Sequence, residues 1–205
     1  MKNVLITGSG IGIGAATAKA FGLIGYRVIV TDILLEAGHK TVNEIIENGG
    51  EASFFEMNVS STNQVNEVVS EVENKYGEIN TLVCNAGIAK KVPLSNLTDE
   101  KWDETLDIDL KGIFRVIRAA VPGMKKMSQG SIICLSSCMG IQYGWDEHVH
   151  YSAAKAGVVG LVRGLAVELS KNGIRVNGIA PGFIRTAQAL SEEHSLGKEG
   201  LEKSN

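Results

Sequence analysis

Tyr151 and Lys155 stand four residues apart, and Ser137 precedes them at the end of an apolar run. Side chains at positions i and i+4 share one face of a helix, so this spacing would set a phenol beside an ammonium group. A free phenol has a pKa of about 10, and ~4 kcal/mol of preference for the phenolate would bring it near 7. A cation about 4 Å away supplies ~4 kcal/mol at an effective dielectric constant of ~20. The pattern therefore predicts proton transfer to or from an oxygen, although the same pair also arises by chance on an amphipathic helix.

The first forty residues predict a nucleotide site that gives this pair a context. An apolar strand at 3–6 runs directly into the glycine-rich turn at 7–14, and residues 15–23 then read as a helix. Glycine lets the backbone turn tightly and approach a pyrophosphate closely. The helix N-terminus beyond it offers unpaired N–H groups and the positive end of the helix dipole. A phosphate group is expected there.

Asp32 predicts which dinucleotide would bind. It ends a second apolar strand, at 27–31, about 20 residues beyond the glycines, where a carboxylate can accept hydrogen bonds from the adenosine ribose. NADP normally needs a nearby cation for its extra phosphate, but residues 9–11 and Ile33 offer none, and Asp32 would repel it. NAD is therefore preferred over NADP. The alternative is a loop of glycines beside a surface aspartate.

With its predicted nucleotide site and its Tyr151–Lys155 pair, the chain resembles the short-chain dehydrogenase/reductase family. Its glycine spacing is that of the family and differs by one residue from the commoner dinucleotide fingerprint. The other family signatures follow in order, namely Asn85-Ala86-Gly87, Ser137, Tyr151 with Lys155, Asn177, and Pro181 to Thr186. The resemblance covers residues 1 to about 186.

The resemblance implies a role for each matching residue. The expected catalytic residues are Ser137, Tyr151 and Lys155, with Asp109 near them. The residues expected to bind the cofactor are Gly8, Gly12, Ile13, Gly14, Asp32, Ile33, Asn58, Val59, Asn85, Ala86, Gly87, Tyr151, Lys155, Pro181, Gly182, Ile184 and Thr186. The substrate is expected to contact Ser137 and Tyr151 and also, from the composition of the loop before Tyr151, Gln142 and Trp145; no metal is expected.

These roles describe hydride transfer between an alcohol and a nicotinamide. In the oxidative direction Tyr151, as phenolate, takes the hydroxyl proton while the carbinol hydride passes to the nicotinamide ring. Ser137 orients the oxygen and, in reverse, stabilises charge on a carbonyl. By resemblance, Lys155 also binds the nicotinamide ribose, so it serves both the cofactor and the phenolate.

Two positions depart from the family pattern. Asp109 stands where the family usually has an asparagine that supports a water-mediated proton relay to the lysine. Its backbone carbonyl is retained and its charge acts on Lys155, so an altered pH dependence is expected rather than inactivity. Asn58 stands where an adenine-binding aspartate is common, and its amide oxygen can still accept from the adenine amino group.

The loop from Cys138 to His150 carries the evidence on the substrate. It contains polar and aromatic residues that suit a hydroxylated molecule, which favours a sugar or polyol, namely Gln142, Tyr143, Trp145, Asp146, Glu147, His148 and His150. A 3-oxoacyl-thioester reductase is the main rival. A catalytically silent NAD-binding protein and an NAD-dependent epimerase are weaker alternatives. The two histidines with Asp146 could form a metal site, but they lack a third firm ligand.

The surrounding pattern alternates strands and helices as repeated βαβ units. The predicted strands are 3–7, 27–31, 51–56, 80–84, 130–136 and 174–180. This predicts the α/β class, a Rossmann-type doubly wound parallel sheet of at least six strands with helices on both faces. The ligand should lie across the carboxyl ends of the strands, where the first and fourth diverge.

Composition agrees with one enzyme domain and argues against other classes. The 205 residues include 24 glycines, as tight strand–helix junctions require, and the net charge is −3. That balance gives no electrostatic case for nucleic acid or an anionic membrane, and no apolar stretch reaches the ~20 residues of a membrane span. A small-molecule substrate is the expected partner. By resemblance, a homotetramer is expected through the long helices at about 102–127 and 151–171.

Three cysteines and the chain ends complete the sequence predictions. Cys84, Cys134 and Cys138 are an odd number in a chain that opens without a signal-peptide pattern, so reduced thiols in the cytoplasm are expected. Residues 1–186 form a single dinucleotide-binding catalytic domain, and 187–205 form part of a substrate lid. By resemblance, we expect this sequence to lack the family's C-terminal continuation, which would leave the sixth strand as a bare apolar edge.

Overall fold

Six parallel strands form one sheet in the order β3-β2-β1-β4-β5-β6 in the computed structural model, which describes residues 1–186, 190 and 191. The strands are β1 (Asn3–Thr7), β2 (Arg27–Asp32), β3 (Glu51–Glu56), β4 (Ile79–Cys84), β5 (Gly130–Leu135) and β6 (Ile174–Ile179). Every predicted strand is found, and its ends differ from the prediction by at most one residue.

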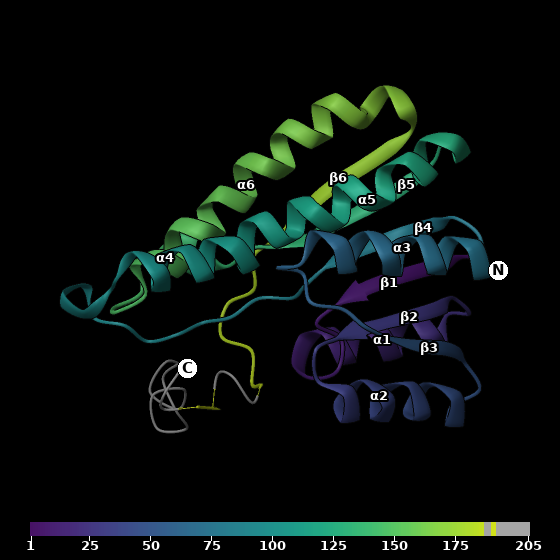
Figure 1. Ribbon diagram of the computed structural model, residues 1–205, viewed down its shortest axis with the longest axis horizontal. Helices are drawn as coiled ribbons and strands as arrows, with labels where there is room; N and C mark the ends of the chain where they lie inside the picture. The colour runs from purple at the N-terminus through teal and green to yellow at the C-terminus, as the bar shows by residue number, and fades with distance from the viewer. Residues whose placement is uncertain (187–189, 192–205) are drawn as a thin grey trace.

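Helices cover both faces of the sheet, as Figure 1 shows. On one face α1 (Gly12–Leu23) and α2 (Leu35–Glu47) pack on the inner strands through Ala18, Val42 and Ile45. On the other face lie α3 (Thr62–Tyr76), α5 (Gly112–Met127) and α6 (Val149–Leu169), which enclose the larger core. The predicted doubly wound α/β fold is therefore confirmed. None of the described helices is both long and apolar enough to cross a membrane.

The central strand β1 explains why the sheet forms here. All five of its residues are buried, because helices cover it on both faces, and an unbroken apolar run is what such a strand requires. β1 pairs with β2 on one side and with β4 on the other. The loops that follow β1 and β4 therefore leave in opposite directions, and a crevice opens between them at the carboxyl ends of the strands.

A π-helical turn, Asp107–Lys111, interrupts the segment that was predicted as one long helix at about 102–127. It joins α4 (Asp99–Leu106) to α5, and its middle residue, Asp109, is buried. A π turn inserts one extra residue per turn, and such turns are frequent at functional sites. Here the turn aims the Asp109 side chain at the carboxyl ends of the strands.

The edge strand β6 differs from the apolar edge that the sequence predicted. Ile174 and Val176 are buried against α6, but Arg175 and Asn177 are exposed, and only Ile179 adds an exposed large apolar side chain. The strand thus alternates between a buried and a largely polar face. The predicted lid at 187–205 lies outside the described residues, except for Leu190 and Ser191.

Candidate active site

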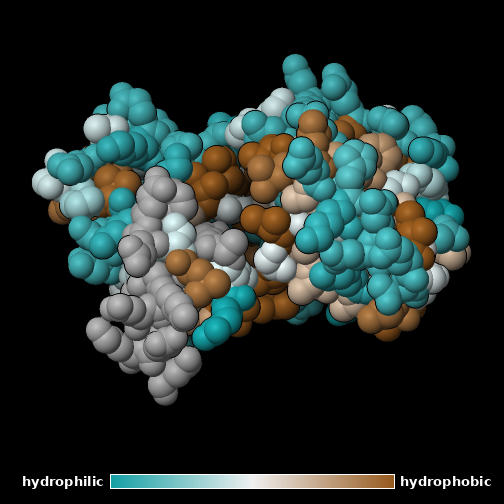
Figure 2. Space-filling model, turned by 90° about the horizontal axis from the view of Figure 1, so that it is seen from below, coloured by the Kyte–Doolittle hydropathy of each residue, from teal (hydrophilic) through white to brown (hydrophobic). Residues whose placement is uncertain are grey.

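A cavity of about 360 Å³ lies at the carboxyl ends of the strands. Figure 2 shows the face on which the molecule is hollowed, with hydrophobic residues gathered around the hollow. Residues that follow β1, β2, β3, β4 and β5 line the cavity together with the start of α6 and the segment 181–186. The site is thus built where the topology predicts, from segments far apart in the sequence.

The glycine loop forms a cradle at one end of the cavity. Gly8 and Gly12 have φ angles of +62° and +57°, which side chains rarely adopt, and α1 begins at Gly12. A Cβ atom on Gly12 would project to 3.5 Å from the Thr186 methyl group across the cavity. Ile11 precedes the helix and has no side-chain acceptor that could cap its first N–H groups. The uncapped N–H donors and the side-chain-free glycines fit the pyrophosphate of a dinucleotide.

Gly14 was predicted to bind the cofactor, but it does not border the cavity. A Cβ atom there would lie 2.1 Å from the carbonyl oxygen of Gly8 and 2.6 Å from Nδ2 of Asn85. Asn85 Nδ2 donates to the carbonyls of Thr7 and Gly8 at 3.0 and 2.8 Å, and Thr7 Oγ1 accepts from the N–H of Asn85 at 3.0 Å. Gly14 is therefore required for packing, because without a side chain at this position α1 can contact Gly8 and Asn85, which are hydrogen-bonded to each other.

Asp32 borders the cavity at the end of β2 and is buried. Its Oδ2 accepts from the N–H of Gly10 at 2.8 Å, and its Oδ1 accepts from the N–H of Leu34 at 3.0 Å. Each carboxylate oxygen retains a second lone pair that can accept from a ribose hydroxyl. Among the described residues that line the cavity, Lys155 is the only basic one, and it lies at the other end, beside Asp109.

Asn58 lines the cavity but is already engaged. Its Oδ1 accepts from both the N–H and the hydroxyl of Ser60, at 2.9 and 2.8 Å. The expected hydrogen bond from an adenine amino group to this oxygen would therefore compete with Ser60. The sequence could not reveal this competition, since it depends on the turn that Asn58 makes with its neighbours.

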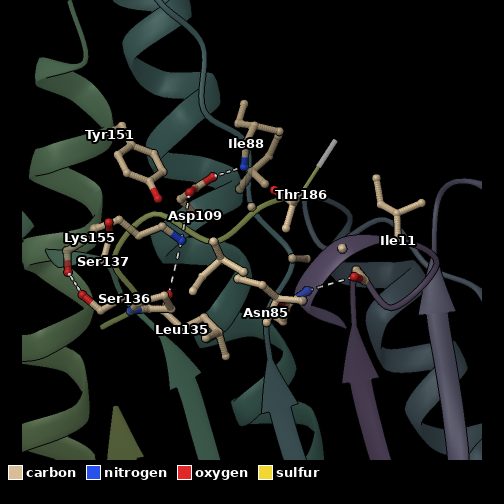
Figure 3. A pocket seen from close by; sticks show the side chains of 18 of the residues that line it. Ile11, Asn85, Ile88, Asp109, Leu135, Ser136, Ser137, Tyr151, Lys155 and Thr186 are labelled. Carbon is tan, nitrogen blue, oxygen red and sulfur yellow. Dashed lines mark hydrogen bonds and ion pairs between the residues drawn. The ribbon is translucent and has the colours of Figure 1, made fainter. Parts of the chain in front are cut away.

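Ser137, Tyr151 and Lys155 meet at the opposite end of the cavity (Figure 3). Tyr151 and Lys155 project from the same side of α6, and the Lys155 ammonium lies 5.5 Å from the Tyr151 ring centroid. Ser137 follows β5, and its Oγ accepts from the N–H of Met139 at 3.2 Å. Because Oγ accepts there, its own hydrogen can be directed at a ligand oxygen. The predicted group is thus brought together.

Asp109 and Lys155 form a buried ion pair at 3.1 Å, with side chains that are 0 % and 5 % exposed. Figure 3 shows Asp109 between Lys155 and Ile88, whose N–H donates to Oδ1 at 2.8 Å. Lys155 also donates to the carbonyl of Leu135 at 3.2 Å. Burial raises the pKa of the Asp109 carboxyl, and Lys155 offsets this only in part. Burial acts to lower the pKa of Lys155, but Asp109 and Tyr151 outweigh it and hold that pKa above its ordinary value.

The substrate end of the cavity is less polar than the sequence predicted. Of the residues expected there, Ser137, Trp145 and Tyr151 border it, but Gln142 does not. Gln142 is exposed and lies outside the cavity lining, so the prediction that it contacts substrate finds no support in its position. Tyr143, Asp146 and Glu147 also lie outside the lining, which includes the apolar Met139 and Phe183 instead.

His148 and His150 are both buried, and neither borders the cavity. His148 Nδ1 lies 2.7 Å from the carbonyl of Asp146, and its ring stacks on Trp145. Burial, together with the neighbouring His148, lowers the pKa of His150. No group of three or more potential metal ligands occurs in the part of the chain that the structure describes. The two histidines are therefore buried residues of the loop 138–150 and not part of the cavity lining.

The sequence missed several residues of the cavity. Most are apolar side chains next to a predicted site residue, and most lie within a few residues of the end of a strand, which is the signal that could have found them. They are Ile11, Leu34, Met57, Ile88, Ile108, Leu135, Ser136, Met139 and Phe183. Ile108, in the π turn, has no such signal. Ser136 is a positioning residue, because its Oγ donates to the carbonyl of Lys155 at 2.7 Å and ties α6 to β5.

Comparisons with known proteins agree with this geometry. A family model described as short chain dehydrogenase matches residues 2–196. The chain is 43% identical over 185 residues to a 3-oxoacyl-(acyl-carrier-protein) reductase of Thermotoga maritima, covering 90% of this chain and 75% of that one. It is 39% identical over 183 residues to a reductase of the same description from Synechocystis, covering 89% and 74%. A crystal structure of a metagenomic short-chain oxidoreductase in complex with NADP superposes with a TM-score of 0.85 at 32% identity, covering 89% of this chain and 82% of that one.

Proposed function

We propose that this chain, which belongs to the short-chain dehydrogenase family of NAD(P)-dependent oxidoreductases, interconverts a 3-oxoacyl thioester and its 3-hydroxy product. The observation that carries the proposal is the meeting of Ser137, Tyr151 and the Lys155–Asp109 pair at one end of a cavity whose other end fits a dinucleotide. A bound nicotinamide would supply or accept the hydride.

The residues of the chain would handle the proton and the oxygen. In the reductive direction, Ser137 Oγ donates to the carbonyl oxygen, and the Tyr151 hydroxyl gives its proton to that oxygen as negative charge develops. Lys155 favours the phenolate that remains on Tyr151, and Asp109 and Leu135 hold the ammonium in place. The glycine loop with Asp32 would hold the adenosine and pyrophosphate, and Ile184 and Thr186 would flank the nicotinamide.

Two observations support a thioester over the sugar or polyol that the sequence favoured. The relatives from Thermotoga maritima and Synechocystis are both described as 3-oxoacyl-(acyl-carrier-protein) reductases. In addition, Met139, Trp145 and Phe183 line the cavity, whereas the polar loop residues that suggested a hydroxylated substrate lie outside it. An apolar lining favours an acyl chain, since burying a methylene group contributes about 0.8 kcal/mol.

The test is a panel of substrates with the purified chain. We expect acetoacetyl thioester to consume NADH stoichiometrically and to yield the 3-hydroxy product, with little turnover of sugars or polyols. Conversion of a nucleotide sugar without net oxidation of NADH would instead indicate an epimerase. Tight NADH binding without turnover of any compound in the panel would indicate a silent binding protein.

We further propose that NAD(H) is preferred over NADP(H), because Asp32 occupies the ribose end and the described cavity lining offers no cation near it. Asp32→Asn keeps one acceptor oxygen and removes the charge. It should lower kcat/KM for NADH about tenfold, the size of one hydrogen bond to a charged group, and should lower kcat/KM for NADPH less. Steady-state kinetics with both cofactors measure this ratio.

The matched control for Asp32→Asn is Glu36→Gln, which removes a carboxylate from the first turn of α2 outside the cavity lining. It should leave the NADH to NADPH ratio as in the wild type. If Asp32→Asn also left that ratio unchanged, or if the wild type used NADPH better, the preference for NADH would be wrong.

The proposal also includes the oligomeric state, the domain bounds and the cellular location. A homotetramer would use α5 and α6, which expose the apolar residues Phe114 and Val167. The single catalytic domain at 1–186, a lid built from 187–205 and a cytoplasmic location stay predictions. Cys84 and Cys134 are buried, Cys138 is partly exposed, and all three are free thiols.

A further inference from the structure

Trp145 and Phe183 form an aromatic wall beside Tyr151. The ring centroids of Trp145 and Tyr151 lie 5.6 Å apart at an angle of 80°, and those of Trp145 and Phe183 lie 6.3 Å apart at 85°. Both Trp145 and Phe183 border the cavity, and they come from different loops, one before α6 and one after β6. A chain attached to a carbon that reacts at Tyr151 can therefore contact this wall.

The His148 ring stacks on the indole of Trp145. The two rings stack with centroids 3.7 Å apart and an angle of 4° between their planes, and His148 is only 1% exposed. The backbone N–H of His148 donates to the carbonyl of Trp145 at 3.1 Å, which closes the turn that holds both rings. One face of the indole is therefore covered by His148, and Trp145 also borders the cavity.

Glu147 anchors the same turn to a different loop. It has a φ angle of +57°, which side chains adopt only at some cost in free energy. Its carboxylate pairs with Lys91 at 2.9 Å, and its carbonyl accepts from the N–H of Val92 at 2.8 Å. Two contacts thus hold a strained residue next to His148, so the position of Trp145 is set before any ligand arrives.

We propose that Trp145 is a specificity-determining residue that packs against the carbon chain attached to the reacting carbon, and that His148 and the Lys91–Glu147 pair are its positioning residues. The proposal rests on the proposed function and adds to it the feature of the substrate that is recognised, an unbranched apolar chain. Aromatic side chains give large contact areas at low conformational cost, and a fixed indole beside Tyr151 orients a chain as well as binding it.

The test compares acyl chains of four, six and eight carbons on one thioester carrier. In the wild type, kcat/KM should rise about fourfold for each methylene group that reaches the wall. In Trp145→Ala this rise should be largely lost, with the four-carbon substrate affected least. Trp102→Phe alters the other tryptophan, on α4 outside the cavity lining, and should keep the full rise.

Lys91→Met tests the positioning role. Removing the ion pair should reduce the rise to about twofold per methylene and act mainly on KM, whereas Lys91→Arg, which can still pair with Glu147, should restore it. The emission of Trp145, read in the Trp102→Phe background, should shift on adding a 3-hydroxyoctanoyl thioester and should change in His148→Ala without any ligand.

The outcomes separate this inference from the proposed function. Absence of turnover on every thioester would defeat both. Turnover with the same chain-length dependence in the wild type and in Trp145→Ala would defeat the specificity role alone. Trp145 emission that does not respond to the 3-hydroxyoctanoyl thioester would contradict contact between the indole and the chain. An unchanged KM in Lys91→Met would remove the positioning role of the pair.

Discussion

Replacing Tyr151 by phenylalanine is expected to lower kcat by a factor of about 10² to 10⁴, the usual contribution of a positioned acid or base. The variant removes only the hydroxyl group. The phenylalanine ring keeps both contacts of the tyrosine ring, the edge-to-face contact with Trp145 at 5.6 Å and the contact with the Lys155 ammonium. The measurement is kcat for thioester reduction, together with NADH affinity by fluorescence, which should change by no more than a few-fold.

Tyr143→Phe is the matched control for Tyr151→Phe. It makes the same chemical change at a tyrosine that is 66% exposed and outside the cavity lining, so kcat should stay at the wild-type value. Turnover at the wild-type rate by a Tyr151→Phe protein that unfolds at the normal temperature would show that this hydroxyl does not carry the proton.

Asp109→Asn is expected to move the pH profile of alcohol oxidation toward acid by about one pH unit, the lower end of what one neighbouring charge does. The Lys155 ammonium favours the phenolate form of Tyr151, and the Asp109 carboxylate, 3.1 Å from that ammonium, works against it. Removing the negative charge makes the phenolate easier to form, so the limb on which activity rises with pH should begin at a lower pH. The measurement is kcat/KM against pH for the wild type and the variant.

The same ion pair predicts a large effect on stability. Asp109→Leu leaves Lys155 buried without its counter-ion, and breaking a buried pair in this way costs roughly 3–5 kcal/mol. Denaturant unfolding at neutral pH should show this loss, whereas Asp109→Asn should lose less, because an amide oxygen can still accept from Lys155 or Ile88. Coincident pH profiles for the wild type and Asp109→Asn would remove the electrostatic role of Asp109.

The sign of the pH dependence of folding follows from the direction of each pKa shift. Burial raises the pKa of Asp109, so the folded chain holds this proton more firmly than the unfolded chain does. The stability that its protonation contributes is complete below the ordinary pKa of an aspartate and is lost as the pH rises through the raised value. Lys155, whose pKa is also raised, contributes its stability until the pH passes that raised pKa in the alkaline range. Asp109→Asn should therefore flatten the acid side of the stability profile.

The sequence predicted the fold well because its signals are local and repeated. The four inner strands contain short apolar runs, and the glycine turn after β1 has a spacing that few other structures need. Most of the expected site residues line the cavity, since a parallel sheet brings the residues that follow its strands to one edge. Gly14 lies outside the lining, and the reason for its small size, the close approach of Gly8 and Asn85, is a contact between segments that the sequence does not reveal.

Other features of the site had no readable signal. The π turn at Asp107–Lys111 has no residue pattern that predicts it, yet it determines where Asp109 points. The loop before α6 has no regular period, so the sequence could not predict that Trp145 borders the cavity while Gln142 lies outside its lining. The stacking of His148 on Trp145 likewise follows from a turn whose shape Glu147 and Lys91 set together.

The hydrogen bonds between the end of β1 and the loop after β4 affect the entropy of cofactor binding. Asn85 and Thr7 exchange hydrogen bonds with each other's loop, and Gly14 packs beneath them without room for a methyl group. The two loops proposed to hold the adenosine and pyrophosphate are therefore tied together before a ligand binds, so little chain entropy should be lost when a dinucleotide docks there. The affinity for the cofactor should then be reduced little by the cost of ordering these loops.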